Sequence, residues 1–348
     1  MAFWKFWSRP RAAAPSHKEK PAPLYRIKTY LSNGKQTTSS SESGITSANG
    51  ADMSAPPRKH TVSGGKPCVV MPLYIYPLPG KDSWQPLYDA IAAHPQVDFL
   101  IVVNPNSGPG EEPLPSTDYM REVPKLNAFP NVTTVGYIAI TWARKSLDDV
   151  KKEIDRYAGW DQKACQDLEI EGLYLEGIYL DETPNHVSEH AKSYLKELTG
   201  YVKGLEGLRG ERLVIHNPGT PPEGPLSAFG SPDLVCVSEE PHHRYIHSEV
   251  QSRIETYSLP HDKTLFQVSG VPLGHVAATT KRILARSAAQ GSSAAGNGAR
   301  TARYIFVTDL EKDFYESFGE SWGCFVRTVA EVVDEEGNGG KKKKKGKK

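Results

Sequence analysis

Short apolar runs recur at regular intervals through most of the chain, and each has the continuous hydrophobic character of a strand buried on both faces. There are eight of them: residues 68–76, 98–105, 131–140, 177–182, 212–218, 233–239, 264–270 and 303–310. Apolar residues at helical spacing occupy several of the intervening segments: 84–93, 147–157, 187–202, 246–257, 276–289 and 320–333. Strands that alternate with helices indicate a parallel sheet covered by helices, and eight such units predict an α/β fold, the closed (β/α)8 TIM-type barrel.

Residues 106–130 are the exception to this alternation. Gly, Pro and Ser are frequent there and the helical period is weak, so the second crossover is expected to be irregular or to carry only a short helix. A doubly wound open sheet is the structural alternative to the barrel. Neither a G-x-G-x-x-G run after the first strand nor a G-x-x-x-x-G-K-[ST] motif occurs, so the sequence does not support dinucleotide or P-loop chemistry.

Composition separates the barrel from both ends of the chain. Residues 1–66 are rich in Ser, Gly, Pro, Ala and Lys, and such a segment buries too little apolar surface to offset its chain entropy. We therefore expect a disordered low-complexity segment at 1–66, a barrel domain at 67–336 and a flexible Lys-rich tail at 337–348.

Charge and hydropathy exclude several function classes. Lys and Arg number 42 against 41 Asp and Glu, so no overall basic charge points to a nucleic-acid partner. No apolar run approaches the roughly 20 residues that span a bilayer, and the N-terminal residues lack the continuous apolar core of a secretory signal. The four Cys show no C-x-x-C spacing, which favours buried free thiols over disulfides or metal ligands. No cofactor is predicted, and a monomer is expected.

Two pairs of adjacent acids follow predicted strands, Asp181 with Glu182 and Glu239 with Glu240. The C-terminal ends of barrel strands carry the catalytic groups of barrel enzymes. Glycoside hydrolysis requires two carboxyl groups, one to protonate the leaving oxygen and one to act as nucleophile or base. Neighbouring acids repel each other, which raises the pKa of one of them. Because side chains alternate along a strand, either member of each pair could face the barrel mouth.

The remaining strand ends are aromatic or polar. Aromatic rings stack on the C–H faces of sugars, while planar polar groups exchange hydrogen bonds with hydroxyls. This chemistry predicts a carbohydrate-binding mouth containing Tyr74, Tyr76, Asn104, Tyr137, Trp142, His216, Asn217 and Glu240. In the alternative interpretation His216 is a structural histidine and some of the aromatic residues belong to the core.

A metal centre is the rival from a different chemistry. Its candidate ligands are Asp181, Glu182, His216, Glu239, His242 and His243. Neither H-x-H nor H-E-x-x-H occurs in the chain, so no metal is predicted.

Several motifs, in this order along the chain, carry a family resemblance. They are PLYIYP at 72–77, VVNPNSGPG at 102–110, GIYLDE at 177–182, VIHNPGT at 214–220 and DLVCVSE at 233–239. Together they resemble the spherulin-4 family (spherulation-specific family 4) of fungal and slime-mould proteins, over residues 68–333.

The resemblance implies a (β/α)8 barrel and, for some members, endo-acting glycoside hydrolysis of α-1,4-linked N-acetylgalactosamine or galactosamine in a polysaccharide such as galactosaminogalactan. It places the catalytic acids at Asp181, Glu182 and Glu239 and makes the polysaccharide the expected partner. It also implies an extracellular or cell-surface location, while the missing secretory signal leaves a cytoplasmic one open. A non-catalytic cell-surface or cell-wall protein that binds carbohydrate with the same barrel is the alternative function.

Overall fold

The computed structural model describes residues 66–80, 83–257, 261–285 and 302–345, with side chains up to residue 336. The segment predicted as disordered, 1–66, lies outside the described residues except for Lys66.

Eight parallel strands form the centre of the fold and close into a barrel in sequence order, with β1 paired to β8. They are β1 (Cys68–Leu73), β2 (Asp98–Val103), β3 (Val132–Ala139), β4 (Gly177–Asp181), β5 (Leu213–Asn217), β6 (Leu234–Pro241), β7 (Thr264–Ser269) and β8 (Tyr304–Val307). Every predicted strand is present within a few residues of its expected bounds. The closed ring confirms the predicted barrel and excludes the open sheet.

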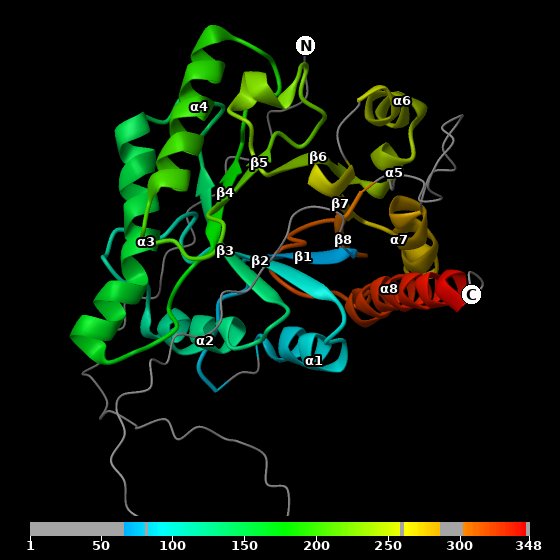
Figure 1. Cartoon of the computed structure of the whole chain (residues 1–348), viewed down its shortest axis with the longest axis horizontal. Helices are drawn as coiled ribbons and strands as arrows, with labels where there is room; N and C mark the ends of the chain where they lie inside the picture. The colour runs from blue at the N-terminus through cyan, green and yellow to red at the C-terminus, as the bar shows by residue number, and fades with distance from the viewer. Residues whose placement is uncertain (1–65, 81–82, 258–260, 286–301, 346–348) are drawn as a thin grey trace, which may run out of the picture. The chain divides into compact units, whose positions relative to one another are not determined.

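Helices surround the ring of strands (Figure 1) and bury its outer face. They are α1 (Gln85–Ala93), α2 (Thr117–Asn127), α3 (Leu147–Leu168), α4 (Glu189–Gly204), α5 (His242–Tyr245), α6 (Ser248–Thr256), α7 (Val276–Leu284) and α8 (Trp322–Lys345). Short 3-10 turns are η1 (Leu226–Phe229), η2 (His261–Lys263) and η3 (Leu273–His275). None of the described helices is long and apolar enough to cross a membrane.

The second crossover is more regular than predicted, because α2 is a helix of 11 residues. Its buried side chains Tyr119, Val123 and Leu126 recur at helical spacing and face the barrel. Pro124 lies inside this helix, and Pro is ordinarily a helix breaker in sequence analysis. Packing of the apolar stripe against the sheet overrides that local signal.

The last helix passes the predicted end of the barrel domain. It begins at Trp322 and ends at Lys345, so it includes most of the segment predicted as a flexible tail, 337–348. All four cysteines are unpaired; Cys68 and Cys236 are buried as predicted, whereas Cys165 is exposed.

Close contact between β3 and α3 depends on a glycine. A Cβ built on Gly136 would lie 2.7 Å from the ring of Tyr157, which is fully buried. The Tyr157 hydroxyl donates a hydrogen bond of 3.0 Å to the Tyr137 carbonyl. The ring is thus fixed against the β3 backbone directly below the strand end that carries Tyr137.

We expect Gly136→Ala to lower the free energy of unfolding by about 1–3 kcal/mol, the usual effect of overpacking a core. A thermal melt should show the midpoint falling by several degrees, at about 2–4 °C per kcal/mol for a domain of this size. The matched control is Gly200→Ala in α4, where the added Cβ meets no atom within 4 Å. This change should leave the midpoint unchanged or raise it. Equal midpoints for the two variants would contradict the packing argument.

Candidate active site

Three neighbouring strand ends bring polar side chains together at the barrel mouth. Asn217, the last residue of β5, donates from Nδ2 to Asp181 Oδ1 at 2.7 Å. The same Nδ2 donates to Glu239 Oε2 at 2.5 Å. Asn217 therefore bridges the acid of β4 to the acid of β6. Its own Oδ1 accepts the backbone N–H of Gly219 at 3.0 Å, which fixes the orientation of the amide.

The geometry of this bridge limits the separation of the two acids. One nitrogen contacts both acids, at 2.7 Å and 2.5 Å. The Asp181 and Glu239 oxygens that it binds are therefore at most 5.2 Å apart, the value for a straight O–N–O line. The bound applies to the nearest pair of oxygens. It favours the short spacing of retaining glycosidases, about 5–5.5 Å between carboxyl groups, over the about 6.5–9.5 Å with which inverting enzymes admit a water.

A tyrosine holds the other oxygen of each acid. The Tyr137 hydroxyl donates to Asp181 Oδ2 at 2.6 Å, and the Tyr315 hydroxyl donates to Glu239 Oε1. Burial, followed by the charge of the nearby acid, raises the pKa of both phenols well above the usual value. Both therefore remain protonated donors at neutral pH, and donors of this kind favour the ionised form of a carboxylate.

Glu182 occupies a different environment from its neighbour Asp181. Its backbone is left-handed, with φ 53°, because the chain turns sharply out of β4. Burial first, and then the charge of Asp181, raise the pKa of Glu182, while hydrogen bonds from Thr141 partly offset the rise. The sequence argument predicted a raised pKa for one of the two acids and was right, although burial contributes more than repulsion.

The two glutamates of β6 face opposite sides of the sheet. Glu239 faces the mouth, whereas Glu240 forms ion pairs with Arg244 at 3.2 Å and Arg253 at 3.6 Å. A register shift between Cys236 and Ser238 decides which of them faces inward. Simple alternation from the inward-facing Cys236 would have pointed Glu240 into the mouth. Glu240 therefore lies against Arg244 and Arg253 and not in the mouth, where the sequence analysis placed it.

His216 does not join the group either. It precedes Asn217 on β5, so alternation turns its ring away from the mouth. The side chain is fully buried, and burial lowers its pKa to about 3. This burial favours the structural interpretation of His216.

The predicted aromatic residues divide into those at the acids and those at the rim. The Tyr74 ring lies 5.3 Å from that of Tyr137 and 4.8 Å from that of Tyr315, measured between centroids. Tyr74 thus forms an aromatic wall beside the carboxylates. Tyr76 and Trp142 are exposed. The Tyr76 hydroxyl contacts Ser116 at 2.8 Å and donates to Asp118 at 3.0 Å, at the start of α2.

Asn104 has a local structural contact, because its Oδ1 accepts the backbone N–H of Gly108 at 3.0 Å in the loop that follows β2. Tyr315 is the main site residue that the sequence analysis missed. It follows β8, in the loop before α8, and only closure of the barrel brings it to Glu239. An aromatic pair just beyond the last predicted strand, Phe314 and Tyr315, is the signal that could have found it.

The metal alternative finds no donor set in the described part of the chain, where no three His, Cys, Asp or Glu side chains gather as ligands would. The ring of His242 lies 6.2 Å from that of His275.

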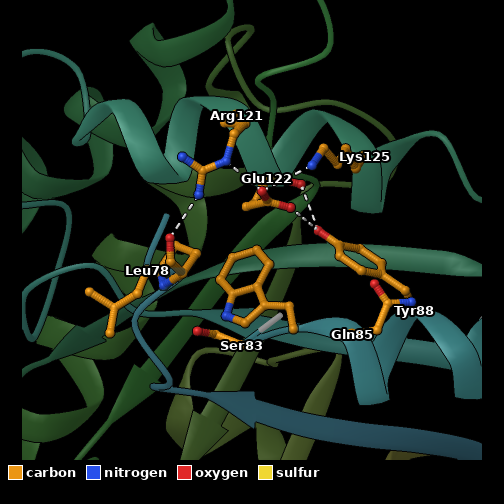
Figure 2. A pocket seen from close by; sticks show the side chains of 9 residues that line it. Leu78, Ser83, Gln85, Tyr88, Arg121, Glu122 and Lys125 are labelled. Atoms are coloured by element: carbon orange, nitrogen blue, oxygen red, sulfur yellow. Dashed lines mark hydrogen bonds and ion pairs between the residues drawn. The ribbon is translucent and has the colours of Figure 1, made fainter. Parts of the chain in front are cut away.

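A second hollow lies away from the acids, between α1 and α2 (Figure 2). Its cations already have partners. Arg121 bonds to Asp118 and Glu122, both at 2.6 Å, and Lys125 bonds to Glu122 at 3.0 Å. Tyr88 also donates to Glu122, at 2.7 Å. The three ion pairs lie within α2, and the bond from Tyr88 joins α1 to it. They leave no unpaired cation among the lining residues of the hollow to attract an anion.

Known proteins share this architecture. The family model of spherulation-specific family 4 matches residues 68–329. Spherulin-4 of Physarum polycephalum is 32% identical over 163 residues, which make up 47% of this chain and 42% of that protein, so the match spans less than half of the relative's length. The crystal structure of Aspergillus clavatus Sph3 in complex with GalNAc is 33% identical, with a TM-score of 0.66, over 78% of this chain and all of that one. These matches confirm the resemblance inferred from the motifs.

The raised pKa of Glu182 predicts a pH-dependent effect of Glu182→Gln. Because the folded state disfavours the ionised form, native Glu182 lowers stability at pH values above its folded pKa, and this effect disappears below the unfolded value of 4.5. At pH 7 the variant should therefore melt at a higher temperature than the native protein. The difference should shrink towards zero as the pH falls through 4.5.

Glu240→Gln is the control, since it breaks the ion pairs with Arg244 and Arg253. It should be no more stable than the native protein at pH 7. Stabilisation by both variants, or by neither, would show that the environment of Glu182 is not the cause.

Proposed function

The chain belongs to spherulation-specific family 4, and from this membership and the paired carboxylates at the barrel mouth we propose that it is an endo-acting glycoside hydrolase. Its substrate is a polysaccharide that contains α-1,4-linked N-acetylgalactosamine or galactosamine, of the galactosaminogalactan type. The observation that carries this proposal is the Asp181–Asn217–Glu239 bridge, which brings one oxygen of each acid within 5.2 Å of the other, so that both acids can reach one glycosidic bond.

The choice of sugar is supported by two independent features. Sph3, with its bound GalNAc, is 33% identical and aligns along its whole length. In this chain, Tyr74 and its neighbours Tyr137 and Tyr315 place aromatic rings beside the acids, where the C–H face of a sugar can stack. The α-1,4 linkage follows from the family resemblance.

The proposed reaction is a double displacement in which Glu239 is the nucleophile and the Asp181–Glu182 pair supplies the acid. The donors on Asp181 and Glu239 favour their ionised forms, whereas the pKa of Glu182 is raised. One carboxylate attacks the anomeric carbon while the other carboxyl group protonates the glycosidic oxygen, so the C–O bond breaks and the reducing-end fragment leaves. The second group then takes a proton from water, and the resulting hydroxide equivalent cleaves the glycosyl ester and restores the nucleophile. Two inversions at one carbon give net retention.

The residues around the pair position it for these steps. Asn217 keeps the two carboxylates at a fixed separation by binding one oxygen of each. The Tyr137 and Tyr315 hydroxyls bind the other oxygen of Asp181 and of Glu239, respectively, and so orient both groups. Burial and the charge of Asp181 raise the pKa of Glu182, which makes it the member of the Asp181–Glu182 pair that holds the proton for the leaving oxygen.

Loss of either acid should abolish hydrolysis. With purified galactosaminogalactan as substrate, and the full chain as enzyme, we expect the native protein to release N-acetylgalactosamine-containing oligosaccharides that mass spectrometry detects. Asp181→Asn and Glu239→Gln should each lower the rate by roughly 10³-fold or more while the thermal midpoint stays near the native value. Glu240→Gln is the matched control, because it changes the adjacent residue on the same strand but faces Arg244 and Arg253. It should keep most of the activity.

Equal losses in Glu239→Gln and Glu240→Gln would contradict the site assignment. A folded native protein that binds the polymer without releasing oligosaccharides would contradict the hydrolase and favour the carbohydrate-binding alternative.

Retention of configuration is the second expected outcome. NMR of the anomeric proton during the first minutes of hydrolysis should show the α-anomer as the initial product of an α-linked substrate. An initial β-anomer would mean inversion and would contradict the short carboxylate separation. Azide rescue of Asp181→Gly, Glu182→Gly and Glu239→Gly then assigns the roles, because loss of the nucleophile yields the β-azide and loss of the acid yields the α-azide.

A further inference from the structure

Exposed large apolar side chains concentrate around the mouth of the barrel. Among the described residues these side chains are Tyr76, Leu78, Trp142, Leu168, Val187, Ile246 and Leu273. All except Leu168 lie in segments that leave the C-terminal end of a strand and lead to the next helix. Leu168 is the last residue of α3 and lies at the opposite end of the barrel. Single exposed apolar residues are normal and need no explanation by themselves. What matters is therefore where these side chains lie relative to the acids.

The order of the strands places two groups of rim residues on opposite sides of the acids. Each group contains exposed apolar side chains, and the second also contains two histidines. The β3–β4 rim consists of Trp142 and Val187, in the segments that follow β3 and β4. The β6–β7 rim consists of His242, Ile246, Leu273 and His275, in the segments that follow β6 and β7. In a closed ring of eight strands, β3 and β7 are four places apart and therefore face each other. A chain laid from one rim to the other crosses the mouth over the carboxylates.

The backbone of the β3–β4 rim is strained in a way that displays its tryptophan. Thr141, Trp142 and Ala143 have φ of 51°, 52° and 62°, three consecutive non-glycine residues in the left-handed region. Each costs roughly 1 kcal/mol or more. The Trp142 N–H donates to the Glu182 carbonyl at 2.7 Å, so the strained turn is attached to the acid pair. The result is an indole ring that is 43% exposed beside the active site instead of buried in the core.

The β6–β7 rim combines apolar side chains with uncharged imidazole. Ile246 is 51% exposed and Leu273 is 49% exposed. Between the same two loops, the ring of His242 lies 6.2 Å from that of His275. Burial, followed by the charges of His275, Arg282 and His243, lowers the pKa of His242. The His242 ring is therefore neutral at pH 7 and offers a flat face rather than a charge.

We propose that the two rims are the ends of one binding track on which a single polysaccharide chain lies across the mouth. This inference rests on the proposed function and adds to it the residues that bind sugars on both sides of the scissile bond. Such a track favours cleavage at internal linkages, because both neighbouring lengths of the substrate contact the protein.

A sugar chain fits this surface better than a protein partner does. The apolar residues are set one or two to a loop, around a mouth that holds ionisable acids, and they do not form one continuous patch. A stable protein interface needs a contiguous area of about 800 Å² on each partner. A polysaccharide alternates C–H faces with hydroxyls and so matches separated apolar contacts.

The test compares rim variants of the full chain on long and short substrates. The variants are Trp142→Ala and the double substitution Ile246→Ser with Leu273→Ser. The matched control is Leu168→Ser. It also removes an exposed apolar side chain, which is 39% exposed, but at the far end of the barrel. Each rim variant should lower kcat/KM on the polymer by about tenfold, which corresponds to about 1.4 kcal/mol. Activity on an aryl glycoside that occupies only the positions next to the scissile bond should fall several-fold less than activity on the polymer.

Two outcomes would overturn the track. If the rim variants have the same kcat/KM on the polymer as Leu168→Ser, the rims do not bind the polymer. If they lose activity equally on the polymer and on the aryl glycoside, the rims act on the reacting centre instead. If no substrate is cleaved, the proposed hydrolase activity fails, and the track is then tested by retention of the same variants on immobilised polymer. Retention equal to that of Leu168→Ser would overturn it there as well.

Discussion

The amide of Asn217 is the group on which the arrangement of the site depends. Two carboxylates that lie within about 5 Å of each other at a partly buried mouth repel strongly, and such a pair persists only where donors compensate each charge. One Nδ2 group supplies a hydrogen bond to Asp181 and another to Glu239, and the Gly219 N–H fixes the amide from behind. The separation of the acids is thus set by the geometry of one planar group at the end of β5.

The residues around this bridge hold the remaining oxygen of each carboxylate. Tyr137 and Tyr315 donate to the remaining carboxylate oxygens, and their rings pack on Tyr74, so the donors themselves are held by aromatic contacts. The Tyr157 ring fits against β3 at Gly136 and supports the strand that carries Tyr137. Packing in the outer layer therefore controls the position of a hydroxyl in the mouth, which is why the scaffold and the site cannot be varied independently.

The barrel mouth has a partly buried centre, which contains the acids, and a solvent-exposed rim, which carries apolar side chains. Asn217, Tyr137 and Tyr315 are buried beside the acids and donate hydrogen bonds to them, whereas the rim displays Trp142, Ile246 and Leu273 to solvent. The strained turn at Thr141–Ala143 connects the two, since it contacts Glu182 through both the Thr141 side chain and the Trp142 backbone. Strain that persists at such a position is consistent with a functional role for the side chain it presents.

Local patterns in the sequence were enough to determine the barrel, its eight strands and the acids at two strand ends, because apolar periodicity and strand order are short-range properties. They did not determine which glutamate of β6 faces the mouth, since the register shift between Cys236 and Ser238 reverses the alternation and arises from pairing with β7. Burial of His216 and the contact of Tyr315 with Glu239 also required the closed sheet, which brings together residues far apart in the chain. The sequence by itself thus determined the scaffold and the candidate acids, and only tertiary structure decided which side chains meet, because their orientation depends on neighbouring strands.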